Sequence, residues 1–255
     1  MILHRRNFFL IGTAGLLAGA APRPPLAATP IARLDLPWWR ARHGAVLRRI
    51  RQGYVDLLYI GDSITQDLEK HGPPDWQNFS PIWQRFYDDR NAVNLGFKGD
   101  TTANVLWRLR NGEISGVAPK LAIVLIGANN LGRVHWGAEE TFAGIEAILA
   151  ELRQRLPRTK ILLLGVLPSE RSIWVSETTS RINRVLAARH PPGGDITCMD
   201  VTPIFQNDGR LDSGKFYDPL LRPPEPPLHP TAQAAAQMAE AIEPTVAALM
   251  GDHRH

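Results

Sequence analysis

The sequence predicts an α/β protein built on a doubly wound, parallel sheet, and two observations carry this prediction. First, five short runs are apolar almost throughout, which is typical of strands that are covered on both faces. Second, amphipathic helical patterns alternate with these runs along the 255-residue chain. In such a sheet, ligands bind beyond the carboxyl ends of the strands, so the residues that follow each run are the first candidates for a functional site.

The strands and helices can be assigned from the periodicity of the apolar residues. The predicted strands lie at residues 55–60, 91–96, 121–127, 160–166 and 195–201. The predicted helices lie at residues 37–53, 80–89, 101–112, 138–156, 178–190 and 231–242. No internal repeat and no domain-sized linker interrupts this alternation, so residues 37–255 are predicted to form a single domain.

The first 28 residues predict an export signal. The pair Arg5-Arg6 precedes an apolar stretch that is shorter than the ~20 residues a membrane-spanning helix needs, and it resembles a twin-arginine signal. Cleavage after Ala20 and cleavage after Ala28 both fit, and an uncleaved anchor remains a further alternative. Residues 29–36 are predicted to be a Pro-rich spacer. The protein is therefore expected to be periplasmic or secreted, and to meet the membrane only transiently during export.

The composition excludes several other classes of function. The net charge is +4, but no block of like charge suggests a nucleic-acid partner. Cys198 is the one cysteine, so no intrachain disulfide can form, and it is expected to be a small buried side chain. No metal-ligand spacing, phosphate loop or dinucleotide motif is present, and we expect no metal and no cofactor. The sequence does not predict the oligomeric state.

Polar residues follow three of the predicted strands. Ser63 follows the first, in "LLYIGDSITQ", and two roles are open for it: a helix cap or a nucleophile. Gly99 lies in "NLGFKGDTT", where a tight turn can present a free backbone N–H. Asn129 follows the third strand in "IGANN" and can either stop the strand or donate to a developing oxyanion. Asp62, adjacent to Ser63, is expected to have a structural role in the turn.

One histidine lies in a setting that suggests chemistry. His229, in "PPLHPTAQ", is held by a Pro-rich loop directly before a predicted helix. A cation at a helix amino terminus is disfavoured, so a catalytic imidazolium at this position needs a compensating acceptor.

These four blocks, in this order, resemble the SGNH (GDSL-type) hydrolase family, and most of all its platelet-activating-factor acetylhydrolase-like esterases. The resemblance covers residues 37–250 and implies a flavodoxin-like three-layer α/β/α sandwich with a five-stranded parallel sheet. It also implies hydrolysis of esters through an acyl-enzyme. Ser63 matches the family nucleophile and His229 the general base. The backbone N–H groups of Ser63 and Gly99 and the side chain of Asn129 match the oxyanion hole.

The sequence departs from the family pattern at one position. The family places an aspartate three residues before the histidine, where this chain has Pro226. Glu225 is the nearest carboxylate and is predicted to orient His229. Asp218 lies eleven residues before His229, and a backbone carbonyl could also accept the hydrogen bond from the ring.

The function expected from these features is hydrolysis of short-chain acyl esters by an exported serine esterase. The subfamily resemblance implies that the acyl group is acetyl. Tryptophans near the predicted loops could stack on sugar rings, which extends the substrate class to acylated glycans; they are Trp76, Trp83, Trp107, Trp136 and Trp174. Two alternatives are open. One is an acyltransferase to a sugar hydroxyl that uses the same site, and the other is a non-catalytic module that binds acylated glycan.

Overall fold

The computed structural model describes residues 23–252, so most of the predicted export signal, together with His253 and His255, lies outside the described residues. The expected sheet is confirmed: five parallel strands are arranged in the order β2-β1-β3-β4-β5. Their bounds are β1 Leu57–Gly61, β2 Ala92–Gly96, β3 Leu121–Leu125, β4 Lys160–Leu164 and β5 Ile196–Met199. The three central strands of this order, β1, β3 and β4, are almost completely buried, as their continuous apolar runs predict.

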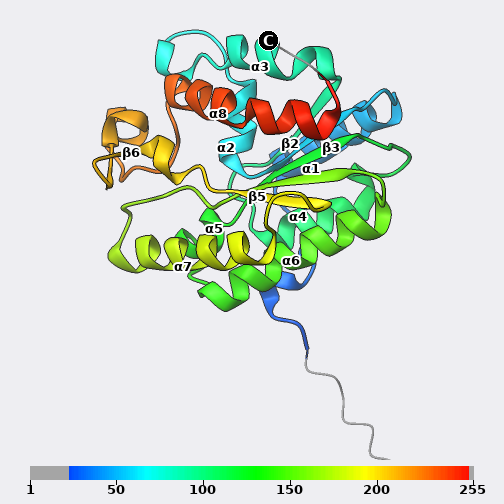
Figure 1. Cartoon of the computed structure of the whole chain (residues 1–255), viewed down its shortest axis with the longest axis horizontal. Coiled ribbons are helices and arrows are strands. Elements are labelled where there is room, and N and C mark those ends of the chain that lie inside the picture. The colour runs from blue at the N-terminus through cyan, green and yellow to red at the C-terminus, as the bar shows by residue number, and fades with distance from the viewer. Residues whose placement is uncertain (1–22, 253–255) are drawn as a thin grey trace, which may run out of the picture.

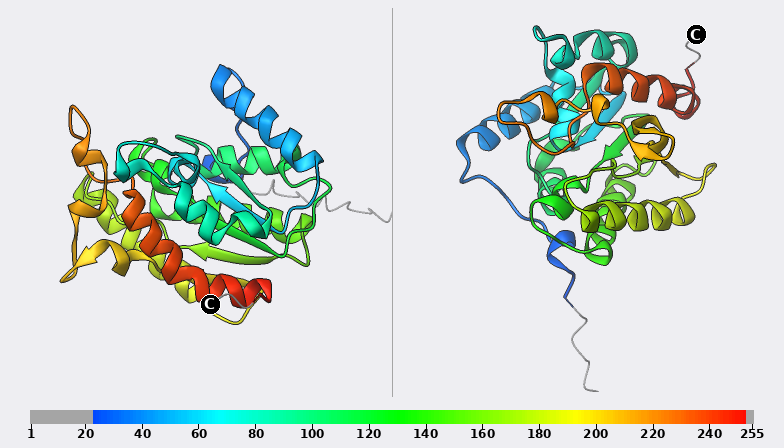
Figure 2. Two further views of the ribbon diagram at one scale, coloured as in Figure 1. Left: turned by 90° about the horizontal axis from the view of Figure 1, so that it is seen from above. Right: turned by 90° about the vertical axis from the view of Figure 1, so that its left-hand side faces the viewer.

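Helices cover both faces of the sheet and produce the expected three-layer α/β/α sandwich. In Figure 1, α3 and α8 lie on one side of the strands, and α4, α6 and α7 lie on the other. The right-hand view of Figure 2 shows the same separation. The main helices are α1 Pro37–Arg51, α3 Ser80–Phe86, α4 Thr102–Arg108, α6 Ala138–Arg155, α7 Ile173–Arg189 and α8 Ala232–Met250. Within the described residues, none of the helices is long and apolar enough to cross a membrane.

Three local features differ from the sequence-based expectation. Helix α7 begins before residue 178, because the Ser172 hydroxyl caps it by accepting a hydrogen bond of 3.1 Å from Val175 N–H. Helix α8 continues past residue 242 and includes Pro244 before it ends at Gly251, which adopts a left-handed conformation. A small antiparallel hairpin, β6 Gln206–Asn207 and β7 Arg210–Leu211, was not predicted.

The strand order brings the carboxyl ends of β1, β2 and β3 together. Gly61 at the end of β1 pairs with Gly96 on one side and with Leu125 on the other. The short helix α2, Ser63–Gln66, packs so closely over this edge that a Cβ on Gly96 would lie 2.2 Å from Gln66 N. Glycine at the end of β2 therefore allows α2 to begin directly above the sheet, and the loops after three strands converge at one edge.

The segment before α1 packs against the domain, which corrects the prediction of a spacer at residues 29–36. Ile31 N–H donates a hydrogen bond of 3.0 Å to Ala103 O, at the start of α4. Ala27, which was assigned to the export signal, is completely buried, and its carbonyl accepts a bond of 2.8 Å from the Thr102 hydroxyl. Burial of Ala27 holds this segment on the α4–α6 surface and is the physical reason for the difference.

Candidate active site

Ser63 is the first residue of α2, and its side chain does not cap the helix. Asp62 has that role, because its Oδ1 accepts a hydrogen bond of 3.0 Å from Ile64 N–H. The Ser63 hydroxyl instead lies 2.9 Å from His229 Nε2. Of the two roles that the sequence left open, the structure assigns the cap to Asp62 and leaves the hydroxyl of Ser63 paired with an imidazole.

Asp218, and not Glu225, accepts the hydrogen bond from the second ring nitrogen of His229. The distance between His229 Nδ1 and Asp218 Oδ1 is 2.6 Å, and Asp218 is 1% exposed. The second oxygen of the carboxylate accepts from the backbone N–H of His229 and, at 2.8 Å, from that of Leu228. Glu225 is exposed, and its backbone N–H donates to Asp218 O. The prediction that Glu225 orients His229 is therefore corrected.

Antiparallel pairing of the chain before and after the Pro-rich loop explains how Asp218 reaches His229. Tyr217 N–H donates to His229 O at 2.9 Å, and Thr231 N–H donates to Lys215 O at 2.9 Å. Asp218 follows directly on this pairing, so it lies beside the imidazole although it is eleven residues away in the sequence. In the family pattern the aspartate lies three residues before the histidine. Here a longer loop separates the two residues, and Asp218 still reaches the imidazole.

The surroundings of Asp218 keep it ionised. Burial alone would raise its pKa, but the hydrogen bond and the attraction from His229, with two backbone N–H donors, outweigh burial and hold the pKa below its usual value. A charged carboxylate at Nδ1 fixes the tautomer in which Nε2 faces Ser63 without its proton, which is the form that accepts a proton from a hydroxyl.

The three predicted oxyanion donors lie at the same edge of the sheet. Gly99 has a φ of 75°, a conformation that favours glycine. Among the described residues, neither Ser63 N–H nor Gly99 N–H has a hydrogen-bond acceptor. Asn129 Nδ2 donates to Asp62 Oδ2 at 3.2 Å and to the backbone oxygen of Asp100 at 3.1 Å. Two donors are thus free in this state, and Asn129 is held in place by Asp62 and Asp100.

Asp62 is buried beneath Asn129 and carries an unusual pKa. Burial raises the pKa of this carboxyl to about 6, against the opposing effects of the Ile64 N–H and of the nearby His229. Asp62 therefore links the start of α2 to Asn129. Its Oδ1 caps the helix, and its Oδ2 accepts a hydrogen bond from the side-chain amide of Asn129.

A buried ionic cluster supports the loop that contains Gly99. Asp100 accepts hydrogen bonds from Trp39 Nε1, Arg33 and Arg108, each at 2.8 Å. Arg108 is completely buried and also pairs with Glu113. Each charge in this cluster has a partner, as burial requires, and the loop is anchored from below. No sequence motif indicates this cluster, because Arg33 and Trp39 precede Asp100 by 67 and 61 residues.

An aromatic side chain that the sequence analysis missed lies against His229. The ring of Tyr217 stacks on the imidazole with a centroid distance of 5.2 Å and an interplanar angle of 13°. Its hydroxyl donates to Asp67 at 2.6 Å and accepts from Lys70 at 3.0 Å. On the other side, Trp76 stacks on Tyr217 at 5.0 Å. The imidazole is thus held on one face by a ring that is itself fixed at its hydroxyl.

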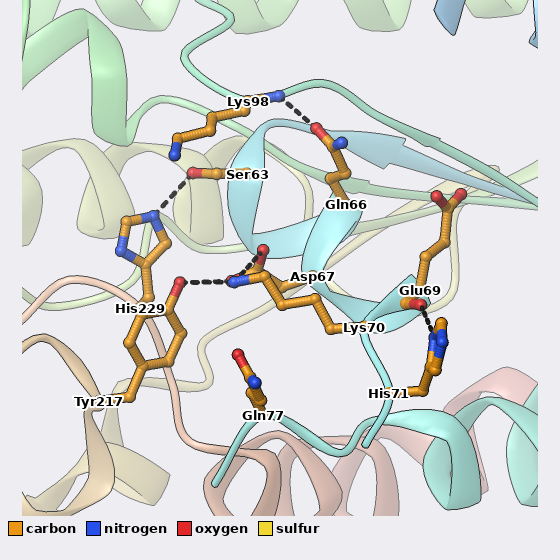
Figure 3. Close-up of a pocket in the computed structure, with 10 residues that line it drawn as sticks. All are labelled: Ser63, Gln66, Asp67, Glu69, Lys70, His71, Gln77, Lys98, Tyr217 and His229. Atoms are coloured by element: carbon orange, nitrogen blue, oxygen red, sulfur yellow. Dashed lines mark hydrogen bonds and ion pairs between the residues drawn. The ribbon is translucent and has the colours of Figure 1, made fainter. Parts of the chain in front are cut away.

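A pocket of about 420 Å³ opens at the Ser63–His229 pair (Figure 3). Its lining residues are Ser63, Gln66, Asp67, Glu69, Lys70, His71, Gln77, Lys98, Tyr217 and His229. Tyr217 contributes the only large ring, and no aliphatic side chain lines the described pocket.

Among the tryptophans that could stack on sugar rings, Trp76 contacts a residue of the pocket lining, Tyr217. Trp107 packs on Trp39 and His43, and Trp83 packs on Tyr87, so both serve the interior. Trp174 is 42% exposed and lies beside His135.

The described residues form neither a metal site nor a reactive thiol. Within residues 23–252, no group of three or more His, Cys, Asp or Glu side chains is arranged to hold a metal ion. Cys198 is buried and free, as expected, and burial raises its pKa to about 11, which keeps it as a thiol.

Known proteins that are similar to this chain are ester hydrolases, which agrees with the arrangement of Ser63, His229 and Asp218. Residues 59–237 match the model of the GDSL-like Lipase/Acylhydrolase family. Platelet-activating factor acetylhydrolase IB subunit alpha2 from Gallus gallus is 30% identical over 229 residues, which cover 88% of this chain and 91% of that protein.

Two solved structures share the fold. A carbohydrate esterase family 3 protein from Talaromyces cellulolyticus has a TM-score of 0.57 at 15% identity, covering 78% of this chain and all of that one (100%). A carbohydrate acetylesterase family member from Sinorhizobium meliloti has a TM-score of 0.54 at 18% identity, covering 76% and 98%. The resemblance seen in the sequence is therefore confirmed: the chain belongs to the GDSL-like lipase/acylhydrolase family and is a carboxylic ester hydrolase.

Proposed function

We propose that this protein hydrolyses acetyl esters of carbohydrates through a covalent acyl-enzyme on Ser63. The observation that carries the proposal is the continuous path from Ser63 Oγ to His229 Nε2 at 2.9 Å and from His229 Nδ1 to Asp218 Oδ1 at 2.6 Å. Both Ser63 and His229 line the pocket of about 420 Å³.

In the first half of the reaction, the Ser63 oxygen attacks the ester carbonyl while His229 Nε2 takes the hydroxyl proton. His229 then returns that proton to the departing alcohol, and the acetyl group remains on Ser63. In the second half, water attacks the acetyl carbonyl, His229 accepts the water proton, and acetate leaves as Ser63 regains its hydrogen. Asp218 stabilises the imidazolium in both halves without itself taking the proton.

The tetrahedral oxyanion is bound by the N–H groups of Ser63 and Gly99, which lack acceptors among the described residues, and by Asn129. The amide of Asn129 shares its hydrogens with Asp62 and Asp100 in this structure, so it donates to the oxyanion by a small rotation that loosens one of two long bonds, of 3.2 and 3.1 Å.

The polar pocket supports an acetyl group and a carbohydrate alcohol. The amides, hydroxyls and lysines of the lining match sugar hydroxyls. The two structural neighbours named above are described as a carbohydrate esterase and a carbohydrate acetylesterase, which supports the same substrate class.

Three measurements test the proposal. A fluorophosphonate probe should label the wild-type protein and leave Ser63→Ala unlabelled, as read by intact mass. The wild-type protein should release acetate from acetylated xylo-oligosaccharides, with Ser63→Ala as the control. Addition of an alcohol acceptor distinguishes hydrolysis from acyl transfer: formation of a new ester in place of acetate would contradict hydrolysis as the main reaction.

Export to the periplasm or the medium completes the proposed function. Removal of residues up to Ala28 would delete Ala27, which is buried against the domain, so the processed chain is proposed to retain Ala27 and cleavage to follow Ala20. Amino-terminal sequencing of the protein recovered from the periplasm tests this site. Replacement of Arg5-Arg6 by two lysines should retain the protein in the cytoplasm if the twin-arginine route is used.

A further inference from the structure

One lysine of the active-site pocket is positioned by its backbone and has no charged partner. Lys98 follows β2, and its N–H donates a hydrogen bond of 2.7 Å to Gln66 Oε1, while its carbonyl accepts one of 3.0 Å from Arg33. Both bonds fix the backbone of Lys98 at the pocket wall. Figure 3 shows its side chain extending from this loop toward the Ser63–His229 pair.

The other acidic and basic groups of the pocket neutralise one another. The carboxylate of Asp67 pairs with Lys70 at 2.9 Å. The carboxylate of Glu69 accepts two bonds from Arg42, at 2.8 and 2.9 Å. Lys98, in contrast, forms no ion pair with any residue that the structure describes. The pocket therefore retains one uncompensated positive charge, on a lysine that lines the same pocket as Ser63 and His229.

Two arginines add positive charge near the same edge of the sheet. Arg133 donates to Gly99 O at 2.8 Å, and Arg171 donates to Ala128 O at 2.8 Å. Arg171 also donates to the Ser169 hydroxyl at 3.2 Å and is attracted by the nearby carboxylates of Asp62 and Asp218. Arg133, in contrast, forms no ion pair with any residue that the structure describes. Positive charges that lack an acidic partner on the protein attract an anion from outside it.

From this arrangement we propose that the preferred substrate is an ester whose alcohol part carries an anionic group, which Lys98 binds. The inference rests on the proposed function: an acetyl group has no ionisable atom, so the negative charge must belong to the alcohol. A carboxylate, sulfate or phosphate near the acetylated hydroxyl shares the required chemistry. Lys98 is therefore a specificity-determining residue that selects acidic over neutral acetylated sugars.

The test uses two small acetyl esters that differ mainly in charge. The anionic probe is 4-acetoxybenzoate, and the neutral probe is its methyl ester. The ratio of kcat/KM for the two probes is measured for the wild type and for Lys98→Ala, and the comparison between variants cancels their different intrinsic reactivities. We expect the ratio of anionic to neutral probe to fall about tenfold in Lys98→Ala, which is the scale of one charge-assisted hydrogen bond.

Two control substitutions and a change of ionic strength test whether the effect depends on the charge of Lys98. Lys98→Arg should keep the ratio within about twofold of the wild type, because the charge remains. Lys120→Ala removes an exposed lysine outside the pocket and should leave the ratio unchanged. Raised ionic strength should lower kcat/KM for the anionic probe in the wild type more than in Lys98→Ala.

Two outcomes would overturn the proposal: an unchanged ratio in Lys98→Ala, or an equal loss for both probes, which would assign Lys98 to catalysis irrespective of substrate charge. Hydrolysis of the neutral probe by the wild type is the separate readout for esterase function, so failure of the charge preference is distinguished from failure of the proposed function. Probes with a sulfonate or a phosphate in place of the carboxylate identify the preferred anion.

Discussion

Asp218 Oδ1 lies 2.6 Å from His229 Nδ1, and the same carboxylate accepts the backbone N–H of His229. One aspartate therefore holds both the ring and the main chain of the proposed general base. A side chain bound at two points has less freedom to rotate, so the imidazole is already aligned with Ser63 before a substrate arrives.

This relationship predicts a large effect at Asp218 and a small one at Glu225. Asp218→Asn should lower kcat by about 10³–10⁴, because an amide at this position favours the wrong tautomer of His229. Glu225→Gln is the matched control and should stay within about twofold of the wild type, because the Glu225 side chain is exposed. Steady-state kinetics with an acetyl ester measure both, and a larger loss in Glu225→Gln would return the orienting role to Glu225.

Asn129 and Asn130 are adjacent, yet the structure gives them different tasks. Asn129→Ala should lower kcat by about 10²–10³ with a small change in KM, as expected for loss of one oxyanion donor. Asn130 bonds the N–H and hydroxyl of Thr102 instead, so Asn130→Ala should mainly lower Tm. Kinetics and thermal unfolding on both variants check this division. Equal effects on kcat would argue against a specific role for Asn129.

The stack between Tyr217 and His229 predicts a contribution of the ring that is separate from that of the hydroxyl. Tyr217→Leu should lower kcat about three- to tenfold, because a stacked aromatic pair contributes about 0.5–1.5 kcal/mol. Tyr217→Phe keeps the ring and loses only the bonds to Asp67 and Lys70, so its kcat should fall less. A KM that rises in both variants while kcat stays constant would place Tyr217 in substrate binding instead.

The raised pKa of Asp62 predicts a specific pH dependence of stability. Since the folded-state value of about 6 exceeds the ordinary value of 3.8, the folded protein binds more protons than the unfolded chain between these values. The stability contributed by Asp62 is therefore greatest at low pH and falls as the pH rises through this window, by up to about 3 kcal/mol.

Asp62→Asn tests this dependence, because asparagine retains the helix cap but does not titrate. The free energy of unfolding of the wild type minus that of Asp62→Asn should decrease from about pH 4 to about pH 7 and then become constant. Urea unfolding at several pH values measures this difference. A difference that does not change with pH would show that the pKa of Asp62 is not raised.

Much of the fold follows from local patterns in the chain. The apolar runs that became β1, β3 and β4 are buried on both faces, and this burial is what continuous hydrophobic strands require. The loops after β1, β2 and β3 converge because these strands are parallel neighbours, so their carboxyl ends lie at one edge of the sheet. The sequence therefore indicates that Ser63, Gly99 and Asn129 meet at one edge of the sheet, and the resemblance to the family adds His229 to that site.

Other features depend on contacts between distant segments, which no local pattern encodes. The spacer expected at residues 29–36 packs on α4 because Ala27 fills a space beside Thr102. Similarly, Tyr217 reaches His229, Asp67 and Lys70 only through the folded chain.

The carboxylate that pairs with His229 shows most clearly the difference between what local sequence patterns predict and what only the tertiary structure decides. Residue types and their order along the chain were sufficient to assign the family, the layered sheet and the nucleophile, because hydrophobic periodicity and strand-end motifs are local properties. They led to Glu225 as the orienting carboxylate, since proximity in sequence was the only measure of distance. The antiparallel pairing of Tyr217 with His229 instead brings Asp218 to the imidazole and leaves Glu225 exposed. Distance in space depends on how the loop closes, and this is decided by backbone hydrogen bonds and burial across the whole domain.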